Sequence, residues 1–264
     1  MKKFIKLTAV FAVSTVMSAT AAFADPFVAI GPKIGTQGIG IEGRAPVMEN
    51  TYVRLGANYF TFKKDYTDKN FGSDLVDDLG YGNNPIVTAM GAAGADIDLK
   101  FKGNLTLTTV PLMVDYHPFD NSGFRVSAGI AYNGNKVKIT SSPIVTLNGV
   151  AIDGNLAIPG VGTVNLYDYL GSISGTIKSK NPVAGVLTLG YDNSFISQNA
   201  FSFSAEAGIM YVGKPKVSLS GNGTILGEKE VVAYLEKKVK KKFKSIERYL
   251  EWYPILSVGV KYSF

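Results

Sequence analysis

Apolar and polar residues alternate with a period of two along many short segments of this chain. The last segment shows this most clearly, because Leu256, Val258, Val260, Tyr262 and Phe264 occupy one face of an extended strand. Small or polar residues occupy its other face. Apart from the first 24 residues, no segment approaches the roughly 18 consecutive apolar residues of a membrane-spanning helix. The chain is therefore predicted to fold as strands, each with one apolar face.

The same alternation recurs in residues 53–59, 97–107, 124–133, 183–192 and 201–211. Segments of this kind, about ten residues long, are typical of membrane β-barrels, in which the apolar face contacts lipid and the other lines the lumen. Closure of the barrel pairs every backbone group, which an open sheet in lipid does not.

A hairpin of residues 27–34 and 39–46, closed at Gly35-Thr36-Gln37-Gly38, brings the expected number of strands to eight. One long first strand is the alternative, and it leaves the two termini on opposite sides of the membrane. The expected fold is all-β: an antiparallel up-and-down transmembrane β-barrel of about eight strands, with one amphipathic helix before the last strand.

The connectors alternate in length. Short turns are expected at 47–50, 120–123 and 193–200, and long loops at 63–95, 144–172 and 221–253. Short periplasmic turns and long external loops are typical of outer-membrane barrels.

The first 24 residues have the features of a secretory signal peptide. Lys2, Lys3 and Lys6 precede an uncharged stretch, and Ala22-Phe23-Ala24 places small residues before the expected cleavage after Ala24. Removal of residues 1–24 lowers the formal charge from +6 to +3, so the basicity does not indicate a nucleic-acid partner. Residues 25–264 form the expected barrel domain, and a retained N-terminal membrane anchor is the alternative to cleavage.

Composition excludes several classes of protein. At 46% hydrophobic and 18% charged residues the chain is too apolar to be disordered. It has no cysteine and one histidine, which excludes a disulfide framework, a Cys-based zinc site and a His-rich metal site. No metal and no cofactor are expected.

The closing segment Tyr253–Phe264, with its terminal Phe264 and with Tyr262 two residues before it, resembles the last strand of bacterial outer-membrane barrels, which the assembly machinery recognises. Residues 35–43, 124–129, 132–136 and 213–219 resemble an uncharacterised proteobacterial family of small outer-membrane β-barrel proteins, similar to the OmpA- and OmpW-like transmembrane barrels. The resemblance implies a small outer-membrane barrel and no particular activity.

Residues 228–251 depart from the alternation. Val231, Leu235, Val239, Phe243, Ile246 and Leu250 recur every three or four residues, which predicts an amphipathic helix. Such a helix either lies on the anionic lipopolysaccharide surface or packs on the barrel rim as a lid, and a periplasmic position would require a different number of strands. The candidate lipopolysaccharide contacts are Lys237, Lys238, Lys240, Lys241, Lys242 and Lys244.

An eight-stranded barrel has an interior that side chains just fill. The inward faces of the expected strands carry four acids and four bases, and buried charges must be paired. The preferred interpretation is an ion-pair network that seals the lumen, and the alternative is a narrow pore gated by rearrangement of those pairs. The residues are Glu42, Arg44, Arg54, Asp115, Arg125, Asp192, Glu206 and Lys261.

His117 is the one histidine, and it lies beside a short turn. Some small barrels remove acyl chains from lipid A with a His and a Ser, but His117 falls at the expected periplasmic end, away from that substrate. Catalysis needs a base within hydrogen-bond reach of its nucleophile, and Ser122 lies across a turn. No catalytic residue and no enzymatic activity are expected.

These features predict an integral outer-membrane protein of a Gram-negative bacterium with a structural or surface-interaction role. A narrow, porin-like channel for small polar solutes is the alternative, followed by a lipid A-modifying barrel enzyme. The expected partners are outer-membrane lipid, lipopolysaccharide and the barrel-assembly machinery, and the expected state is a monomer that binds no nucleic acid.

Overall fold

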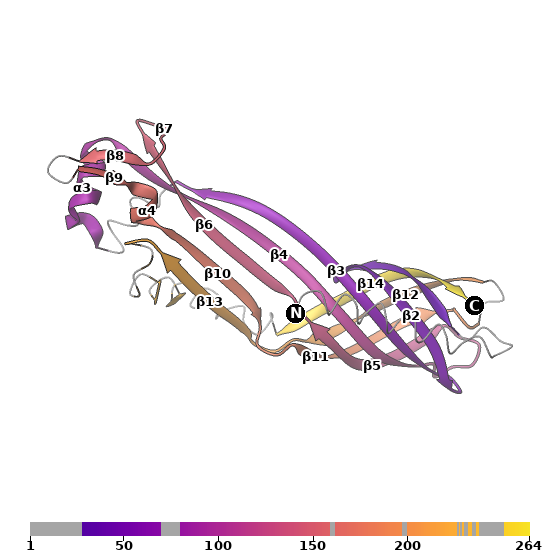
Figure 1. Ribbon diagram of the computed structural model, residues 1–264. Coiled ribbons are helices and arrows are strands. Elements are labelled where there is room, and N and C mark those ends of the chain that lie inside the picture. The colour runs from indigo at the N-terminus through magenta and orange to yellow at the C-terminus, as the bar shows by residue number, and fades with distance from the viewer. Residues whose placement is uncertain are drawn as a thin grey trace.

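The computed structural model describes residues 28–69, 80–158, 162–196, 200–225, 227, 229, 232–233, 236–237 and 251–264 (Figure 1). The expected signal peptide lies outside these residues. So does most of the expected helix 228–251, although the described positions 229, 232–233 and 236–237 are helical.

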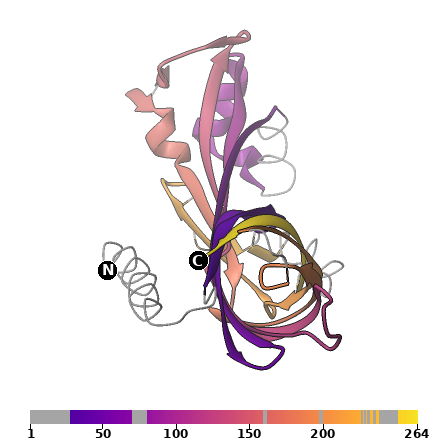
Figure 2. The same ribbon diagram turned by 90° about the vertical axis from the view of Figure 1, so that its right-hand side faces the viewer.

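Eight strands pair in a closed ring, which Figure 2 shows nearly end-on. The pairing runs from β1 through β2, β3 and β4 to β5, then through β11, β12 and β14 back to β1, and every pair is antiparallel. The ring strands are β1 (Ala29–Gly35), β2 (Gly38–Met48), β3 (Thr51–Asp68), β4 (Ala95–Tyr116), β5 (Phe124–Asn133), β11 (Val183–Asp192), β12 (Phe201–Tyr211) and β14 (Trp252–Ser263).

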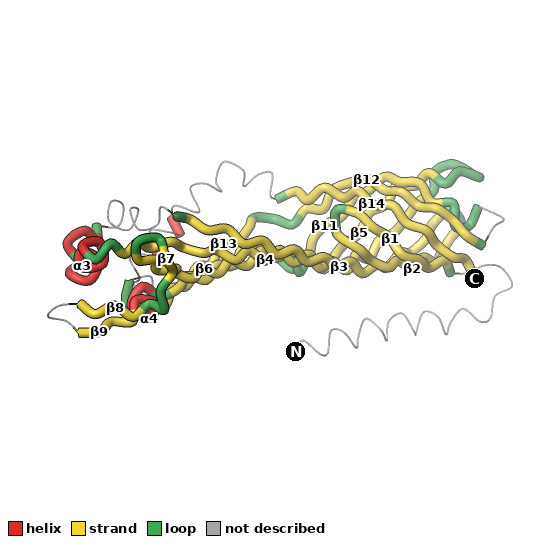
Figure 3. Tube along the Cα trace, turned by 90° about the horizontal axis from the view of Figure 1, so that it is seen from above, coloured by secondary structure: helices red, strands yellow, loops and turns green. Residues whose placement is uncertain are grey.

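The sheet does not stop at the ring. It contains twelve strands, because further strands continue beyond one end of the barrel as an open extension (Figures 1 and 3). These are β6 (Lys136–Leu147), β7 (Val150–Ala151), β10 (Ser172–Ser179) and β13 (Pro215–Asn222). The all-β antiparallel class is thus confirmed, and the sheet is larger than the expected barrel.

The extension arises because ring strands run on past the barrel. In the ring β4 pairs with β5 at residues 109–116, and above it β4 pairs with β6 at 95–106. Strand β5 therefore continues as β6 after Gly134-Asn135. In the same way β10 continues into β11 after Pro182, and β12 continues into β13 after Gly213. Proline lacks an N–H for the ladder, and Gly213 has φ +69°, so the strands kink where the ring ends.

This arrangement corrects two expectations. Residues 97–107 belong to the extension, and the barrel part of that strand is 109–116. Residues 63–68, 144–147 and 221–222 are strand and not external loop, because ladder pairing with neighbouring strands satisfies their backbone groups.

A small hydrophobic core covers the far end of the extension. Helices α3 (Pro85–Ala92) and α4 (Leu166–Leu170), the 3-10 turn η1 (Tyr81–Asn83) and the hairpin of β8 (Asn155–Ile158) with β9 (Gly162–Asn165) lie here. Met90, Leu99, Val145, Leu166 and Leu170 are each at most 1% exposed. None of the described helices is long and apolar enough to cross a membrane.

The outer surface of the ring is apolar. The large hydrophobic side chains among its outward residues are about half exposed, from Tyr262 at 40% to Phe201 at 68%. The inward side chains carry the charges, so the ring has the reverse of a water-soluble protein's distribution. The outward hydrophobic residues include Ile34, Ile39, Ile41, Tyr59, Leu112, Val114, Tyr116, Ile130, Tyr132, Val183, Leu187, Leu189, Tyr191, Phe201, Phe203, Ile209, Tyr211, Trp252, Leu256, Val258, Val260, Tyr262 and Phe264.

Candidate functional site: the barrel lumen

The structure brings all eight candidate lumen residues together inside the ring. They come from β2, β3, β4, β5, β11, β12 and β14, and each sits at an inward position of its strand. Their exposed fractions range from 0% for Asp115 and Asp192 to 8% for Glu206. The charges are thus removed from water and must be stabilised by one another.

Arg54 lies at the centre of the network. Its Nη1 is 2.7 Å from Glu42 Oε2 and 3.0 Å from Glu206 Oε2, and its Nε is 3.0 Å from Asp115 Oδ2. A guanidinium group presents several N–H donors in fixed directions, so one arginine can contact three carboxylates from three other strands.

Two further arginines connect the same carboxylates. Arg125 places Nη1 3.0 Å from Asp115 Oδ1 and Nη2 3.2 Å from Glu206 Oε2. Arg44 lies 3.3 Å from Asp115 and 3.2 Å from Asp192. Each carboxylate therefore contacts more than one cation, so the loss of one partner leaves a charge that the rest of the network only partly compensates.

Lysines complete the network. Lys261 Nζ is 2.8 Å from Glu42 Oε1 and also pairs with Asp192. Lys33, on β1, was not among the candidates, although its Nζ lies 2.9 Å from Glu42 Oε2 and 3.4 Å from Glu206 Oε1. Lys33 lies opposite Gly40 and Gly259, which are at inward positions of β2 and β14. The alternation of β1 in the sequence, extended to Lys33, would have placed it inward as well.

With Lys33 the network holds five bases and four acids among the described residues, so this part of it carries one formal positive charge in excess. Arg44 Nε, Arg54 Nη2 and Arg125 Nε are buried without a hydrogen-bond partner among the described groups.

A second layer, which was not predicted, fills the lumen toward the extension. Met113, Val186, Met210 and Ile255 form a buried apolar cluster with small alanines, and each of the four is at most 7% exposed. The same alternation that placed Glu206 inward puts Met210 inward four residues later, so the signal was present in the sequence.

Polar side chains line the lumen beside the apolar cluster, where Gln37 Nε2 lies 3.9 Å from Met210 Sδ. Asn58 Nδ2 donates to Thr109 Oγ1 at 3.0 Å and lies 3.3 Å from Gln37 Oε1, on the turn between β1 and β2. All three residues are at most 5% exposed. The β1–β2 hairpin is thus short, and its tip is hydrogen-bonded to the wall of the lumen.

Aromatic groups lie at the opposite end of the lumen, where the short turns are. The Cζ atom of Arg44 lies 3.9 Å from the centre of the Tyr52 ring, which stacks on Phe195 at 5.0 Å. His117 is 5% exposed and packs edge-on against Tyr52 at 5.1 Å. The lumen therefore has three successive layers: an aromatic cap, the ion network and the apolar cluster.

His117 is held by both ring nitrogens. Its Nε2 contacts the Arg44 guanidinium, so it must accept, and its Nδ1 lies 3.2 Å from the backbone oxygen of Ser122, so it must donate. The Ser122 hydroxyl is not the partner, because it accepts a hydrogen bond from the Phe124 amide at 3.2 Å. Among the described residues, the geometry thus places no hydroxyl nucleophile on His117.

The two residues of the expected assembly signal lie on the outer face of the ring. Tyr262 and Phe264, the expected assembly signal, are 40% and 58% exposed on the outer face, and their rings contact each other at 4.9 Å. Of the six candidate lysines in 228–251, Lys237 is exposed and the other five lie outside the described residues. Their contact with lipopolysaccharide stays a prediction.

Among the described residues no group of three or more His, Cys, Asp and Glu side chains is placed to hold a metal ion. The lumen carboxylates contact cationic side chains instead.

No family model and no curated protein matches the chain. Among solved structures it is similar to CarO2 of Acinetobacter baumannii, with 24% identity and a TM-score of 0.48 over 90% of this chain and 98% of that one. CarO of A. baumannii gives 20% identity and a TM-score of 0.45 over the same shares. A major outer membrane protein from Thermus thermophilus gives 17% and 0.32 over 92% of this chain and 100% of that one. The function of the chain is therefore inferred from its own residues.

Proposed function

We propose that this chain is an integral β-barrel protein of a Gram-negative outer membrane whose lumen is sealed and whose extension interacts at the cell surface. The observation that carries this proposal is the inverted ring, with an apolar outer face around a buried ion network. Water does not accommodate such an outer face, whereas lipid does.

The dimensions of the apolar surface support a membrane position. Aromatic residues lie at both borders of the apolar surface. These are Phe201 and Tyr211 on β12, and Trp252 and Tyr262 on β14. Ten residues of strand, tilted by about 40°, span roughly 25 Å, which is the height of the apolar band of outer-membrane barrels. Aromatic residues at both borders are typical of membrane interfaces.

The three layers of the lumen support a sealed barrel over a channel. A polar solute would have to pass the apolar cluster around Met113 and Met210, then separate ion pairs such as Arg54–Glu42, then pass Tyr52 and Phe195. Each step requires removing packed or paired groups from one another, which costs free energy.

The surface role is supported by the shape of the molecule. The extension continues from the ring for the length of β6, β10 and β13 (Figure 1), and it carries its own small core at the far end. A structural or interaction role is proposed in preference to catalysis, since His117 is engaged by Arg44 and by a backbone carbonyl.

Planar-bilayer conductance of the refolded chain 25–264 tests the sealed lumen, with heat-modifiable gel migration as the check of folding. We expect no stable single-channel steps from the wild-type protein. The variant Glu206→Ala combined with Met210→Ala removes one group from each of two layers, and we expect it to conduct with a preference for anions, because the excess of positive charge increases.

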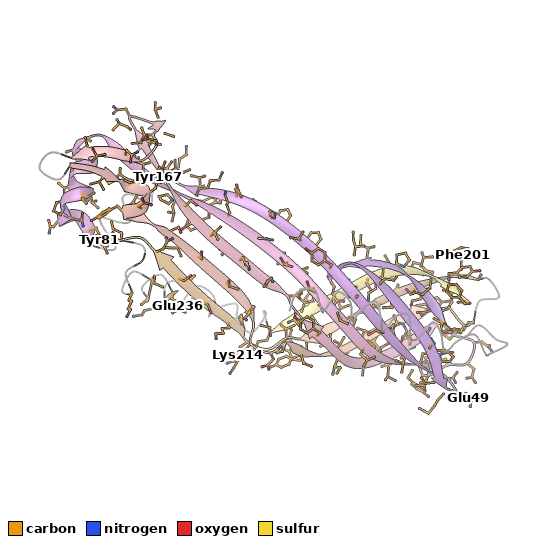
Figure 4. All side chains as sticks on the ribbon, viewed as in Figure 1. Glu49, Tyr81, Tyr167, Phe201, Lys214 and Glu236 are labelled. Atoms are coloured by element: carbon orange, nitrogen blue, oxygen red, sulfur yellow. The ribbon has the colours of Figure 1, made fainter. Side chains whose placement is uncertain are left out.

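The matched control is Glu49→Ala, which removes an exposed carboxylate at the short-turn end (Figure 4) and is expected to stay silent. Reproducible steps from the wild-type protein would contradict the seal and favour the narrow channel. A silent double variant that migrates as folded protein would contradict the expectation that removing one group from each of these two layers opens the lumen.

A further inference from the structure

The extension continues the outer, lipid-facing surface of the ring. On β4 every second residue faces outward. This face carries Leu112 and Val114 in the ring, and Thr106 and Lys102 in the extension. Lys136 lies directly opposite Thr106 across the β4–β6 pairing, so it shares that face. The outward side chains of the extension therefore lie directly above the apolar outer surface of the ring.

Three lysines stand side by side on neighbouring strands of this face. Lys178 on β10 is directly opposite Lys136 on β6 and directly opposite Lys216 on β13. Like charges directly opposite one another in a sheet are destabilising. We call Lys136, Lys178 and Lys216 the lysine row.

Further lysines surround the row. Lys138 lies on the same face of β6, two residues beyond Lys136. Lys180 and Lys214 are exposed in the kinks where the extension meets the ring, and the Lys180 amide donates to the Lys214 carbonyl at 3.2 Å. Figure 4 labels Lys214 at this junction.

The structure offers this cluster little countercharge. Within the described part of the chain, the ion pair on this face joins Asp65 to Lys100 at 3.3 Å, and no member of the lysine row makes one. Lysine on an edge strand protects a sheet from aggregation. That explanation applies to Lys216 on the edge strand β13 but not to Lys136 and Lys178, which lie on interior strands.

The height of the row matches the headgroup layer of a membrane. Tyr132 ends the apolar surface on β5, and Lys136 follows four residues later, which places it about 10 Å higher on a tilted strand. The polar layer of a bilayer begins at the hydrocarbon edge, where aromatic residues lie, and extends outward over a comparable distance. A lysine side chain at this height reaches the phosphates of that layer.

We propose that the lysine row binds the phosphate groups of lipopolysaccharide in the outer leaflet, as a site distinct from the candidate lysines of residues 228–251. This inference rests on the proposed membrane position. Each ammonium group near an anionic surface contributes to binding, and an anion placed between the lysines relieves their mutual repulsion.

Native mass spectrometry of the refolded chain 25–264 in detergent, titrated with bisphosphorylated lipid A, tests the inference. We expect the triple variant Lys136→Gln, Lys178→Gln and Lys216→Gln to bind lipid A at least about tenfold more weakly than the wild-type protein, because three cationic contacts are lost. Added salt should weaken wild-type binding more than binding by the variant.

The matched control removes three charges elsewhere, as Lys64→Gln, Lys69→Gln and Lys100→Gln, and is expected to bind as the wild-type protein does, because Lys100 already pairs with Asp65. Lipid A without phosphates is expected to bind weakly to all three proteins. Heat-modifiable migration shows that each variant is folded.

Equal affinity of the row variant and the wild-type protein would overturn the inference, as would equal losses in both triple variants. Tighter binding of a soluble sulfated polysaccharide than of lipid A would assign the row to a soluble polyanion instead. Insertion of the wild-type protein into phosphatidylcholine vesicles tests the membrane position separately. Failure to insert overturns the proposed location together with this inference, whereas insertion with unchanged lipid A binding overturns the inference alone.

Discussion

At the residue scale, the protonation of His117 shows how the lumen network reaches the end of the barrel. The imidazole lies just past the end of β4, where Nε2 faces the Arg44 cation and Nδ1 donates to a carbonyl. Burial, and next the positive charge of Arg44, lower the pKa of His117 below its usual value. The native state therefore holds the neutral Nδ1–H tautomer.

We expect His117 to titrate below the unperturbed histidine pKa of about 6.5. In the unfolded chain His117 binds a proton as the pH falls through about 6.5, whereas in the folded chain it binds one only at lower pH. The contribution of neutral His117 to stability is therefore complete above about pH 6.5 and decreases as the pH falls below that value. Because the chain has one histidine, NMR of ¹³C-labelled histidine assigns the titration without ambiguity. A midpoint at or above about 6.5 would contradict the contact with a cationic Arg44, and a peptide of residues 112–122 serves as the unperturbed reference.

At the element scale, closure of the ring depends on how closely β1 approaches β14. A Cβ atom built on Gly31 would lie 1.8 Å from the Val260 carbonyl oxygen and 2.7 Å from Lys261 Cα. The neighbouring backbone cannot yield without separating the pair that joins the first strand to the last. A Cβ atom built on Gly43, in the next strand β2, would have no neighbouring atom within 4 Å.

Gly31→Ala is expected to destabilise the barrel by about 1–3 kcal/mol, as overpacking does, while Gly43→Ala stays within about 1 kcal/mol of the wild-type protein. Urea titration followed by heat-modifiable migration measures both variants under the same conditions. Equal midpoints for the two variants would show that β1 and β14 are not in close contact at Gly31.

At the scale of the whole molecule, the proposed membrane position can be read from one side chain. Trp252 is the single tryptophan of the chain, is 48% exposed and packs against Tyr211 at 4.9 Å, at the border of the apolar surface nearest the extension. Tryptophan at such a border lies at the level of the lipid headgroups.

In proteoliposomes, Trp252 fluorescence should be quenched more by lipids brominated near the headgroup than by lipids brominated deep in the acyl chain. The matched variant Trp252→Phe with Val258→Trp moves the fluorophore about 15 Å along the tilted strand, onto an outward position that is 47% exposed. Deep bromines should then quench more strongly. Equal quenching at both depths, or none, would argue against the proposed orientation of the ring.

The sequence by itself determined which side of each strand faces inward, because alternation is a local property with a period of two. That parity was enough to choose eight lumen residues, all of which the structure brings together, and it also contained Lys33 and Met210, which were overlooked. The interpretation of residues 228–251 as a helix and of 1–24 as a signal peptide concerns residues that lie largely or wholly outside the described chain.

Only the tertiary structure decided which strand pairs with which. The change of partner along β4, from β5 to β6, and the three carboxylates around Arg54 join segments far apart in the chain. Cross-strand neighbours follow from register over the whole sheet, and a local pattern carries no information about register between distant strands. The lysine row is visible for the same reason only in the folded sheet, since its members are 42 and 38 residues apart in the sequence.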